Sequence, residues 1–224
     1  MPHAALKLEK RFLIISALGN LLVGCVGILV AAVSSSQAIL LDGLFNLIYL
    51  ATALFTIKVA TLVARGDDER FPYGYAFFES IINGIKGLLM LGVSIMAMVG
   101  AFKALMTGGH EVAAGIAIAY GVFAFICCGI VAYITHRGAK LTGSPLVRAD
   151  AENWVVNSGF SCCVLLAFVG IFVLRALQLV ALTIYVDQSV VVVVVGISLV
   201  VPVRMSWKAL MELMNKAPES SVIE

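Results

Sequence analysis

The chain has 224 residues, of which 62% are hydrophobic and only 12% are charged. Soluble globular domains carry about 25% charged residues, and the mean hydropathy of this chain is +1.06. These values exclude a soluble domain and predict an integral membrane protein that crosses the bilayer several times. The net charge is only +2, and no basic patch indicates a nucleic-acid partner.

Six apolar segments, each long enough to cross a bilayer, follow one another along the chain. The predicted spans are 12–33, 37–63, 77–104, 112–135, 150–174 and 186–206. We therefore expect an N-terminal segment (1–11), a six-helix transmembrane domain (12–206) and a short tail (207–224), which forms an interfacial helix or the frayed end of span six. Six consecutive valines (190–195) favour a strand in water, but lipid admits only helices or closed barrels, so an all-α bundle is predicted.

The basic residues of the connecting segments predict the orientation of the bundle. Most lie before span one, in the connections 64–74 and 136–145, or after span six, which is one side of a six-span protein. The opposite side carries only Lys103 and Arg175. By the positive-inside rule, both termini are expected in the cytoplasm, and the protein is expected in a bacterial inner membrane.

Polar side chains follow one face of several predicted spans. A carboxylate is costly to bury in lipid, so Asp42 in the second span is expected to face polar groups. Helical spacing places the residues of each span on one face. Such stripes indicate a shared hydrated cavity, although hydrogen bonds that only join helices would use the same residue types. The stripes comprise Asn20 in span one, Asp42, Asn46 and Tyr49 in span two, Glu79, Asn83 and Lys86 in span three, and Asp150, Asn153 and Asn157 in span five.

A lysine lies deep in the third span. Lys86 is about nine residues from the inner end of this span, which is a depth of roughly 14 Å, too deep for its side chain to reach the interface easily. It must pair with a carboxylate, be neutral or contact water; Asp42 is the expected partner and Glu79 the second choice. Lys86, Glu79 and Asp150 are candidates for charge or proton coupling, although Asp150 also suits a helix N-terminus through its charge alone. The candidates for lining the cavity are Asn20, Tyr49 and Asn83.

Four stretches of the sequence carry a family resemblance. They are the segment with Asp42 and Asn46, the junction 71–80 that ends in Glu-Ser, the stretch 144–151 that enters span five, and the pair Asn153 and Asn157. Together they resemble the cation diffusion facilitator family of divalent-metal/proton antiporters, over residues 10–210. The resemblance implies six transmembrane helices, dimers, a cytoplasmic metal-binding domain that usually follows the helices, and a transport site built from spans two and five.

Carried onto this chain, the family's transport site corresponds to Asp42, Asn46, Asn153 and Asn157. The resemblance thus implies a transported cation as the ligand and no other cofactor. Asp42 is the only carboxylate of the four, whereas relatives have carboxylate-rich sites, often with a histidine. We therefore expect a short member without the cytoplasmic domain, whose atypical site suits a harder, weakly held cation.

The predicted function is secondary transport of a cation, in particular proton-coupled efflux of a divalent metal ion. A degenerate subunit that does not transport but stabilises a partner is the alternative, and a carrier of a monovalent ion or small solute also stays open. No Ser/His/Asp, Cys/His or paired-carboxylate constellation indicates an enzyme. The expected partners are the cation, the proton, the lipid bilayer and a second copy of the chain, which would contact the third span at its small residues, Ser80 with Gly84 and Ala97 with Ala101.

Overall fold

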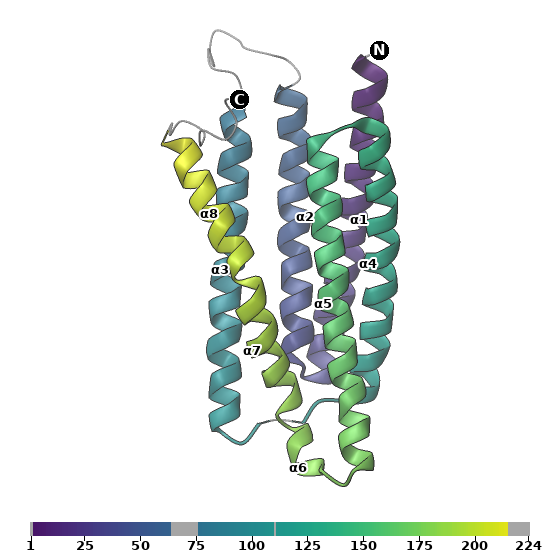
Figure 1. The fold of residues 1–224 in the computed structure, drawn as a ribbon, viewed down its shortest axis with the longest axis vertical. Helices are drawn as coiled ribbons and strands as arrows, with labels where there is room; N and C mark the ends of the chain where they lie inside the picture. The colour runs from purple at the N-terminus through teal and green to yellow at the C-terminus, as the bar shows by residue number, and fades with distance from the viewer. Residues whose placement is uncertain (1, 64–75, 110, 215–224) are drawn as a thin grey trace, which may run out of the picture.

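The computed structural model describes residues 2–63, 76–109 and 111–214, which form a bundle of helices (Figure 1). Within these residues, six stretches are long and apolar enough to cross a membrane: Lys7–Ser34, Gln37–Phe55, Ser80–Met106, Ala114–Thr142, Asp150–Ala176 and Val186–Leu213. The prediction of an all-helical protein with six spans is confirmed. The helices are α1 (Pro2–Ser34), α2 (Gln37–Val63), α3 (Ala76–Met106), α4 (Ala114–Thr142), α5 (Pro145–Ala176), α6 (Val180–Thr183), α7 (Val186–Ser198) and α8 (Val200–Leu213).

The first and last helices extend beyond the predicted transmembrane domain. α1 begins at Pro2 and α8 ends at Leu213. The start of α1 and the end of α8 lie at the same end of the bundle (Figure 1), as an even number of spans requires. The cytoplasmic location of this end stays a prediction. Arg65, Arg70 and Lys216 lie outside the described residues, as does the first half of the junction 71–80.

The connection predicted over 136–145 is largely helical, so this prediction was wrong. Gly143 ends α4 in a left-handed conformation with φ of 65°. Ser144 then caps α5, because its hydroxyl accepts a hydrogen bond of 3.4 Å from the N–H of Val147, and Pro145 opens the helix. A glycine C-cap followed at once by a serine N-cap and a proline lets the chain reverse direction within a very short turn.

Span six consists of two consecutive helices, α7 and α8. The valine run predicted to be helical lies within α7. Pro202 has no N–H, so the carbonyl of Ser198 lacks its usual helical partner. The interruption falls at Leu199, between the two helices. Together α7 and α8 cross the bundle obliquely beside α3 (Figure 1).

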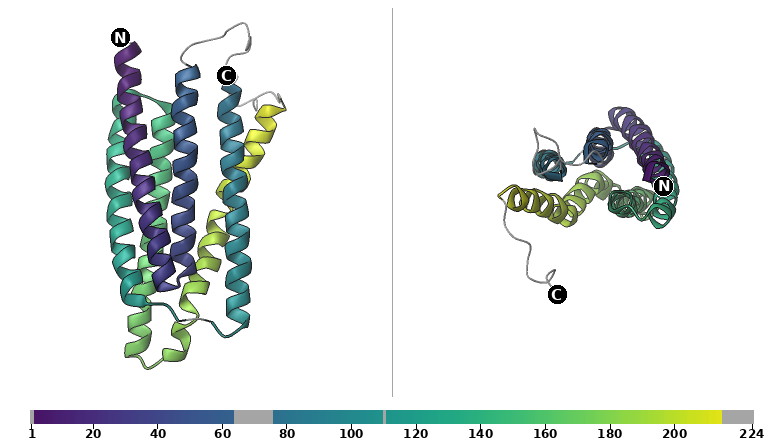
Figure 2. Two further views of the ribbon diagram at one scale, coloured as in Figure 1. Left: turned by 180° about the vertical axis from the view of Figure 1, so that it is seen from behind. Right: turned by 90° about the horizontal axis from the view of Figure 1, so that it is seen from above.

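α2 is the most enclosed of the six spans. It packs against α1, α3, α5 and α7, and 44% of its span is buried, compared with 17% for α3. α4 packs against α5 and α1, while α3 stands at one side with α8 (Figure 2). The polar residues of α2 are therefore held inside the protein, whereas α3 presents many apolar side chains to the surrounding lipid.

Small residues on α3 allow α8 to approach closely. A Cβ atom added to Gly84 would lie 3.1 Å from the Cβ of Ala209, and one added to Gly87 would meet the backbone of α8 at 2.9 Å. Next to this contact, the hydroxyl of Ser80 donates a hydrogen bond of 2.5 Å to Glu212. Ser80 and Gly84, the pair expected at a dimer contact, thus pack within the chain, and the homodimer stays a prediction.

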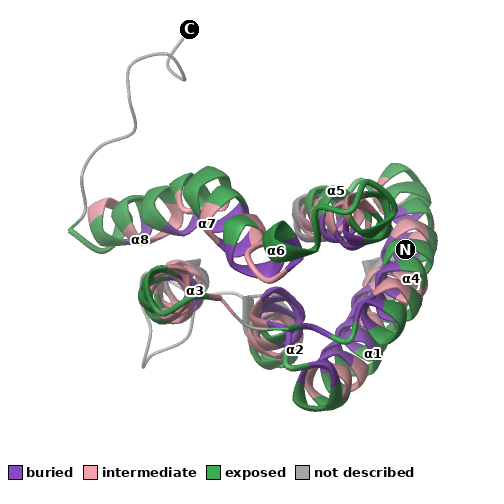
Figure 3. Cartoon of the chain, turned by 90° about the horizontal axis from the view of Figure 1, so that it is seen from below, coloured by how far each residue is buried: buried purple, intermediate pink, exposed green. Residues whose placement is uncertain are grey.

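The start of α2 is capped by a side chain from α7. Asp187 is only 1% exposed and accepts hydrogen bonds from the hydroxyl of Ser36 at 2.6 Å, the N–H of Gln37 at 2.8 Å and the N–H of Ala38 at 3.3 Å. A helix N-terminus leaves its first N–H groups without partners and favours a nearby negative charge. Asp187 therefore joins α7 to α2 at the end of the bundle opposite the termini, where both helices turn buried faces inward (Figure 3).

Candidate cation site

Asp42 lies in the interior of the bundle and is only 2% exposed. Its Oδ2 atom accepts a hydrogen bond of 2.6 Å from the hydroxyl of Tyr120, and its Oδ1 atom accepts one of 3.2 Å from the amide of Asn46. The same amide nitrogen donates to the main-chain carbonyl of Asp42 at 2.8 Å. The carboxylate therefore faces polar groups and not lipid.

Asn157 brings α5 to this cluster. Its amide nitrogen donates a hydrogen bond of 3.1 Å to Oδ1 of Asn46 and a weaker one of 3.6 Å to the sulfur of Cys128. Asn46 is fully buried and Asn157 is 8% exposed. The structure thus places Asp42, Asn46 and Asn157 in one hydrogen-bonded cluster, although α2 and α5 carry them far apart in the sequence.

Asn153, the fourth predicted ligand, lies at the edge of the cluster. In the described part of the chain, no hydrogen bond joins it to the other three predicted ligands. It borders a void of about 10 Å³, which is roughly the space of one water molecule. The residues around this void are Asn20, Tyr49, Asp150, Asn153, Trp154 and Asn157.

A larger polar cavity, which we call the vestibule, lies between α3, α5 and α8 toward the end that holds the termini. Its volume is about 510 Å³. Asn153 borders both the vestibule and the small void, so polar side chains continue from this end of the bundle to Asp42. The vestibule is lined by Ser80, Asn83, Lys86, Glu152, Asn153, Val201, Met205, Lys208, Ala209 and Glu212.

Lys86 lines the vestibule and is 8% exposed. Its ammonium lies 4.2 Å from the centre of the Tyr49 ring, within the range of a cation–π interaction. The predicted ion pair with Asp42 is not formed among the described residues, because Asp42 takes its donors from side chains of α2 and α4. The prediction that Lys86 pairs with Asp42 was therefore wrong, and the contact of Lys86 is the ring of Tyr49.

The other predicted residues fall into three groups. Asn20 is 3% exposed and lies at the void with Tyr49, while Asn83 lines the vestibule. Asp150 is not in the first turn of α5, so the helix dipole alone does not explain it. Its Oδ2 atom is buried and has no hydrogen-bond partner among the described residues. Glu79 belongs to α3, but its side chain lies outside the described part.

Sequence reasoning missed Tyr120, Cys128 and Asp187. Tyr120 and Cys128 lie in α4, whose sequence shows no polar stripe. The available signal was that a tyrosine hydroxyl buried in an apolar helix usually finds a partner. Asp187 lies at the start of the predicted sixth span, and no periodic pattern linked it to the start of the second.

The donor atoms of the cluster indicate which cations it suits. No group of three or more His, Cys, Asp or Glu side chains gathers in the described ranges. The predicted ligands offer one carboxylate and several amide oxygens. Oxygen ligands suit hard cations such as Mg²⁺, Ca²⁺ and Mn²⁺, whereas tight zinc sites use nitrogen and sulfur.

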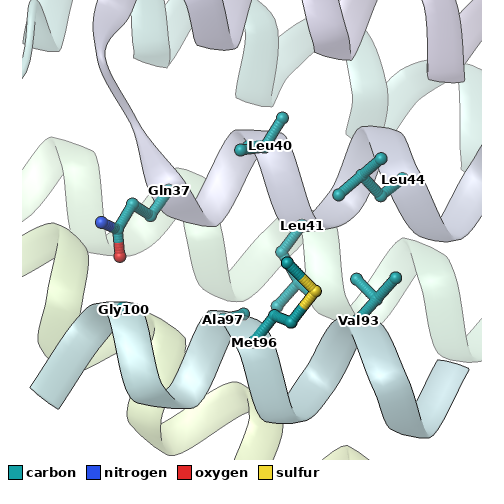
Figure 4. A pocket seen from close by; sticks show the side chains of 8 residues that line it. All are labelled: Gln37, Leu40, Leu41, Leu44, Val93, Met96, Ala97 and Gly100. Carbon is teal, nitrogen blue, oxygen red and sulfur yellow. The ribbon is translucent and has the colours of Figure 1, made fainter.

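A separate groove of about 220 Å³ lies between α2 and α3 (Figure 4). It carries no acidic side chain and lies apart from the Asp42 cluster. Ala97 lines the groove and Ala101 is fully buried, so the second pair of small residues expected at a dimer contact also packs within the chain. The groove is lined by Gln37, Leu40, Leu41, Leu44, Val93, Met96, Ala97 and Gly100.

Comparison with known proteins decides the family. Residues 13–214 match the protein-family model described as the cation efflux transmembrane domain. The chain belongs to this family. Membership agrees with the resemblance in the sequence and identifies a multi-pass membrane protein of a transporter family, not an enzyme.

Several relatives of this cation efflux domain are similar over part of their length. The uncharacterized transporter sll1263 of Synechocystis is 26% identical over 142 residues, which are 63% of this chain and 46% of the relative. The uncharacterized transporter YdbO of Bacillus subtilis is 24% identical over 174 residues, 75% of this chain and 57% of the relative. The magnetosome protein MamM of Paramagnetospirillum magneticum is 21% identical over 142 residues, which are 63% of this chain and 45% of the relative. The chain spans about half the length of these curated relatives.

Proposed function

We propose that this cation efflux domain carries a cation across the membrane and binds it at the four predicted ligands, Asp42, Asn46, Asn153 and Asn157. The observation that supports this proposal most directly is the hydrogen-bonded contact between α2 and α5 at a buried carboxylate. Polar side chains lead from the vestibule to this contact. Intramembrane acids with such surroundings usually mark an ion pathway.

The cargo is a hard divalent cation that the site holds weakly. Asp42 supplies one negative charge, and the asparagines supply neutral carbonyl oxygens. In the structure the amide nitrogen of Asn46 faces Asp42, and that of Asn157 faces Asn46. A bound cation needs oxygens in place of these nitrogens, so both amides turn when the site is loaded.

Lys86 couples the cation to a proton. Its ammonium lies in the vestibule wall, beside the route from the open cavity to Asp42. An incoming cation repels this charge, and the loss of one proton from Lys86 relieves the repulsion. If the termini are cytoplasmic, the vestibule faces the cytoplasm, and the exchange of an inner cation for a proton is efflux.

A second candidate function is a structural subunit that does not transport. One observation favours it: both oxygens of Asp42 already accept hydrogen bonds from Tyr120 and Asn46. A buried carboxylate with its partners in place requires no cation, and such a network can simply join helices.

Calorimetric titration of the purified protein distinguishes the two functions. Mg²⁺, Ca²⁺, Mn²⁺, Fe²⁺, Co²⁺, Zn²⁺ and Cd²⁺ are each titrated into the wild type, the Asp42→Ala variant and a Glu111→Gln control, which removes an exposed carboxylate between α3 and α4. We expect binding heat for at least one cation that Asp42→Ala abolishes and Glu111→Gln retains. A flat response to all seven cations supports the structural function instead. Uptake of the bound cation into proteoliposomes then separates transport from binding.

A further inference from the structure

Tyr120 reaches the candidate site from a third helix. It lies on α4, which packs mainly against α5 and α1. The side chain is 3% exposed, and its hydroxyl donates the 2.6 Å hydrogen bond to Oδ2 of Asp42. Of the two side-chain hydrogen bonds given to this carboxylate, the one from Tyr120 is shorter than the 3.2 Å bond from Asn46. Tyr120 also lies outside the two helices that carry the predicted ligands.

The position of the Tyr120 hydroxyl depends on a glycine in α1. A Cβ atom added to Gly27 would lie 2.7 Å from the hydroxyl oxygen of Tyr120 and 3.0 Å from the Cα atom of Gly43. The absence of a side chain at Gly27 thus lets α1 and α2 approach each other and leaves room for the phenol beside them. The Tyr120 ring also packs near Phe123, with 6.4 Å between ring centres.

The two oxygens of Asp42 have different partners. Asn46 bonds Oδ1 and lies within the set of predicted ligands, whereas Tyr120 bonds Oδ2 and lies outside it. When a cation displaces the amide nitrogen from Oδ1, the phenol can keep its bond to Oδ2. The carboxylate then stays in one orientation while its other oxygen faces the cation.

We propose that Tyr120 is a positioning residue for the cation site, which fixes the carboxylate of Asp42 so that Oδ1 faces Asn46. The inference rests on the proposed function, because it assumes that Asp42 binds the cargo. Carboxylates that bind metals are generally hydrogen-bonded in turn, and loss of such an outer partner lowers metal affinity by about 10- to 100-fold.

The test compares Tyr120→Phe with the wild type and with Tyr133→Phe, a control on the same helix whose side chain is 61% exposed. Mn²⁺ and Co²⁺ are titrated calorimetrically, their uptake into proteoliposomes is measured, and the visible absorption bands of bound Co²⁺ are recorded. We expect Tyr120→Phe to raise Kd and KM by about tenfold, to leave kcat within about twofold, and to change the Co²⁺ bands. Tyr133→Phe should match the wild type.

A purely structural role gives a different result: a lower melting temperature of the cation-free protein, with Kd and the Co²⁺ bands unchanged. That result overturns the positioning role while Asp42-dependent binding, and with it the proposed function, remains. If neither Mn²⁺ nor Co²⁺ binds the wild type in an Asp42-dependent way, both proposals fail for these ions.

A second variant keeps the test decisive if Tyr120→Phe does not fold. Gly27→Ala retains the phenol but forces its hydroxyl away from the place it occupies beside α1. We expect the same direction of change, a higher Kd for Mn²⁺ and Co²⁺. A wild-type Kd in a folded Gly27→Ala protein contradicts the positioning role.

Discussion

The two ends of the bundle differ in packing: one has a polar cavity, and the other is closed by buried side chains. At the end that holds the termini, α3, α5 and α8 leave a polar vestibule of about 510 Å³. At the opposite end, Asp187 binds the start of α2, and the side chains of Ile39, Val191 and Val195 are fully buried between the helices. We call these the open end and the closed end.

The contrast shows which polar groups are structural and which line a route. Asp187 at the closed end has three hydrogen bonds to the start of α2, and satisfied buried networks make a protein rigid. Toward the open end, Oδ2 of Asp150 lacks a hydrogen-bond partner among the described residues, and Lys86 rests on an aromatic ring. Buried oxygens without a hydrogen-bond partner among the described residues also lie at the closed end, on Ser34 and Gln37. The open end differs because Asp150 borders the small void and Lys86 lines the vestibule, where water or a passing ion can reach them.

The sharpest test of the contrast is chemical labelling from each side of the membrane. The five native cysteines are replaced by alanine, and a single cysteine is introduced as Asn83→Cys in the vestibule or Val191→Cys at the closed end. We expect a charged maleimide to label Asn83→Cys at least about a thousandfold faster, because the closed end must first open locally and each 1.4 kcal/mol of opening slows labelling tenfold. Similar labelling rates at the two positions would contradict the difference between the open end and the closed end.

Removal of the cap should weaken the closed end selectively. Asp187→Ala leaves the Ser36 hydroxyl and the N–H groups of Gln37 and Ala38 without their buried acceptor. We expect the free energy of unfolding to fall by about 3 kcal/mol, measured by denaturant titration in detergent micelles. Labelling of Val191→Cys should become faster in the same background. Ser189→Ala, at an exposed position of α7, is the control, and equal stability of the two variants excludes a structural role of the cap.

A smaller loss is expected from a change at the contact between α3 and α8, beside the vestibule. Gly87→Val places atoms against the backbone of α8, where an added Cβ already lies 2.9 Å from the carbonyl oxygen of Pro202. Overpacking of this kind should lower the free energy of unfolding by about 2 kcal/mol. Gly92→Val on the same helix is a matched control, because a Cβ there meets nothing within 4 Å. If both variants unfold alike, the close packing of α3 against α8 does not contribute to stability.

The smallest effect on stability concerns Lys86. Lys86→Met keeps a flexible side chain on the ring of Tyr49, so stability should change by less than about 1 kcal/mol. Proton exchange per transported cation, measured with a pH-sensitive dye in proteoliposomes, should nevertheless be lost. Lys103→Met removes an exposed lysine of the same helix that lies outside the vestibule lining, and it should leave the exchange unchanged. Unchanged exchange in Lys86→Met removes this lysine from the coupling mechanism.

The sequence by itself determined the membrane location, the six helical spans and the residues of the polar stripes. These properties are local, because the length of an apolar run and the helical period can be read from neighbouring residues. The exception was the segment 136–145, where polar composition indicated a loop and two helix caps formed a short turn.

Only the tertiary structure decided which polar groups meet. Tyr120 bonds a carboxylate 78 positions away, Asn157 bonds Asn46 across 111 positions, and Asp187 bonds Ser36 across 151. Such contacts depend on how each helix is rotated and which neighbour it packs against, and the period of one helix contains no information about either. For the same reason the expected pairing of Lys86 with Asp42 failed. Lys86 lies over the ring of Tyr49, seven positions along α2 from Asp42, and Asp42 bonds Tyr120 and Asn46.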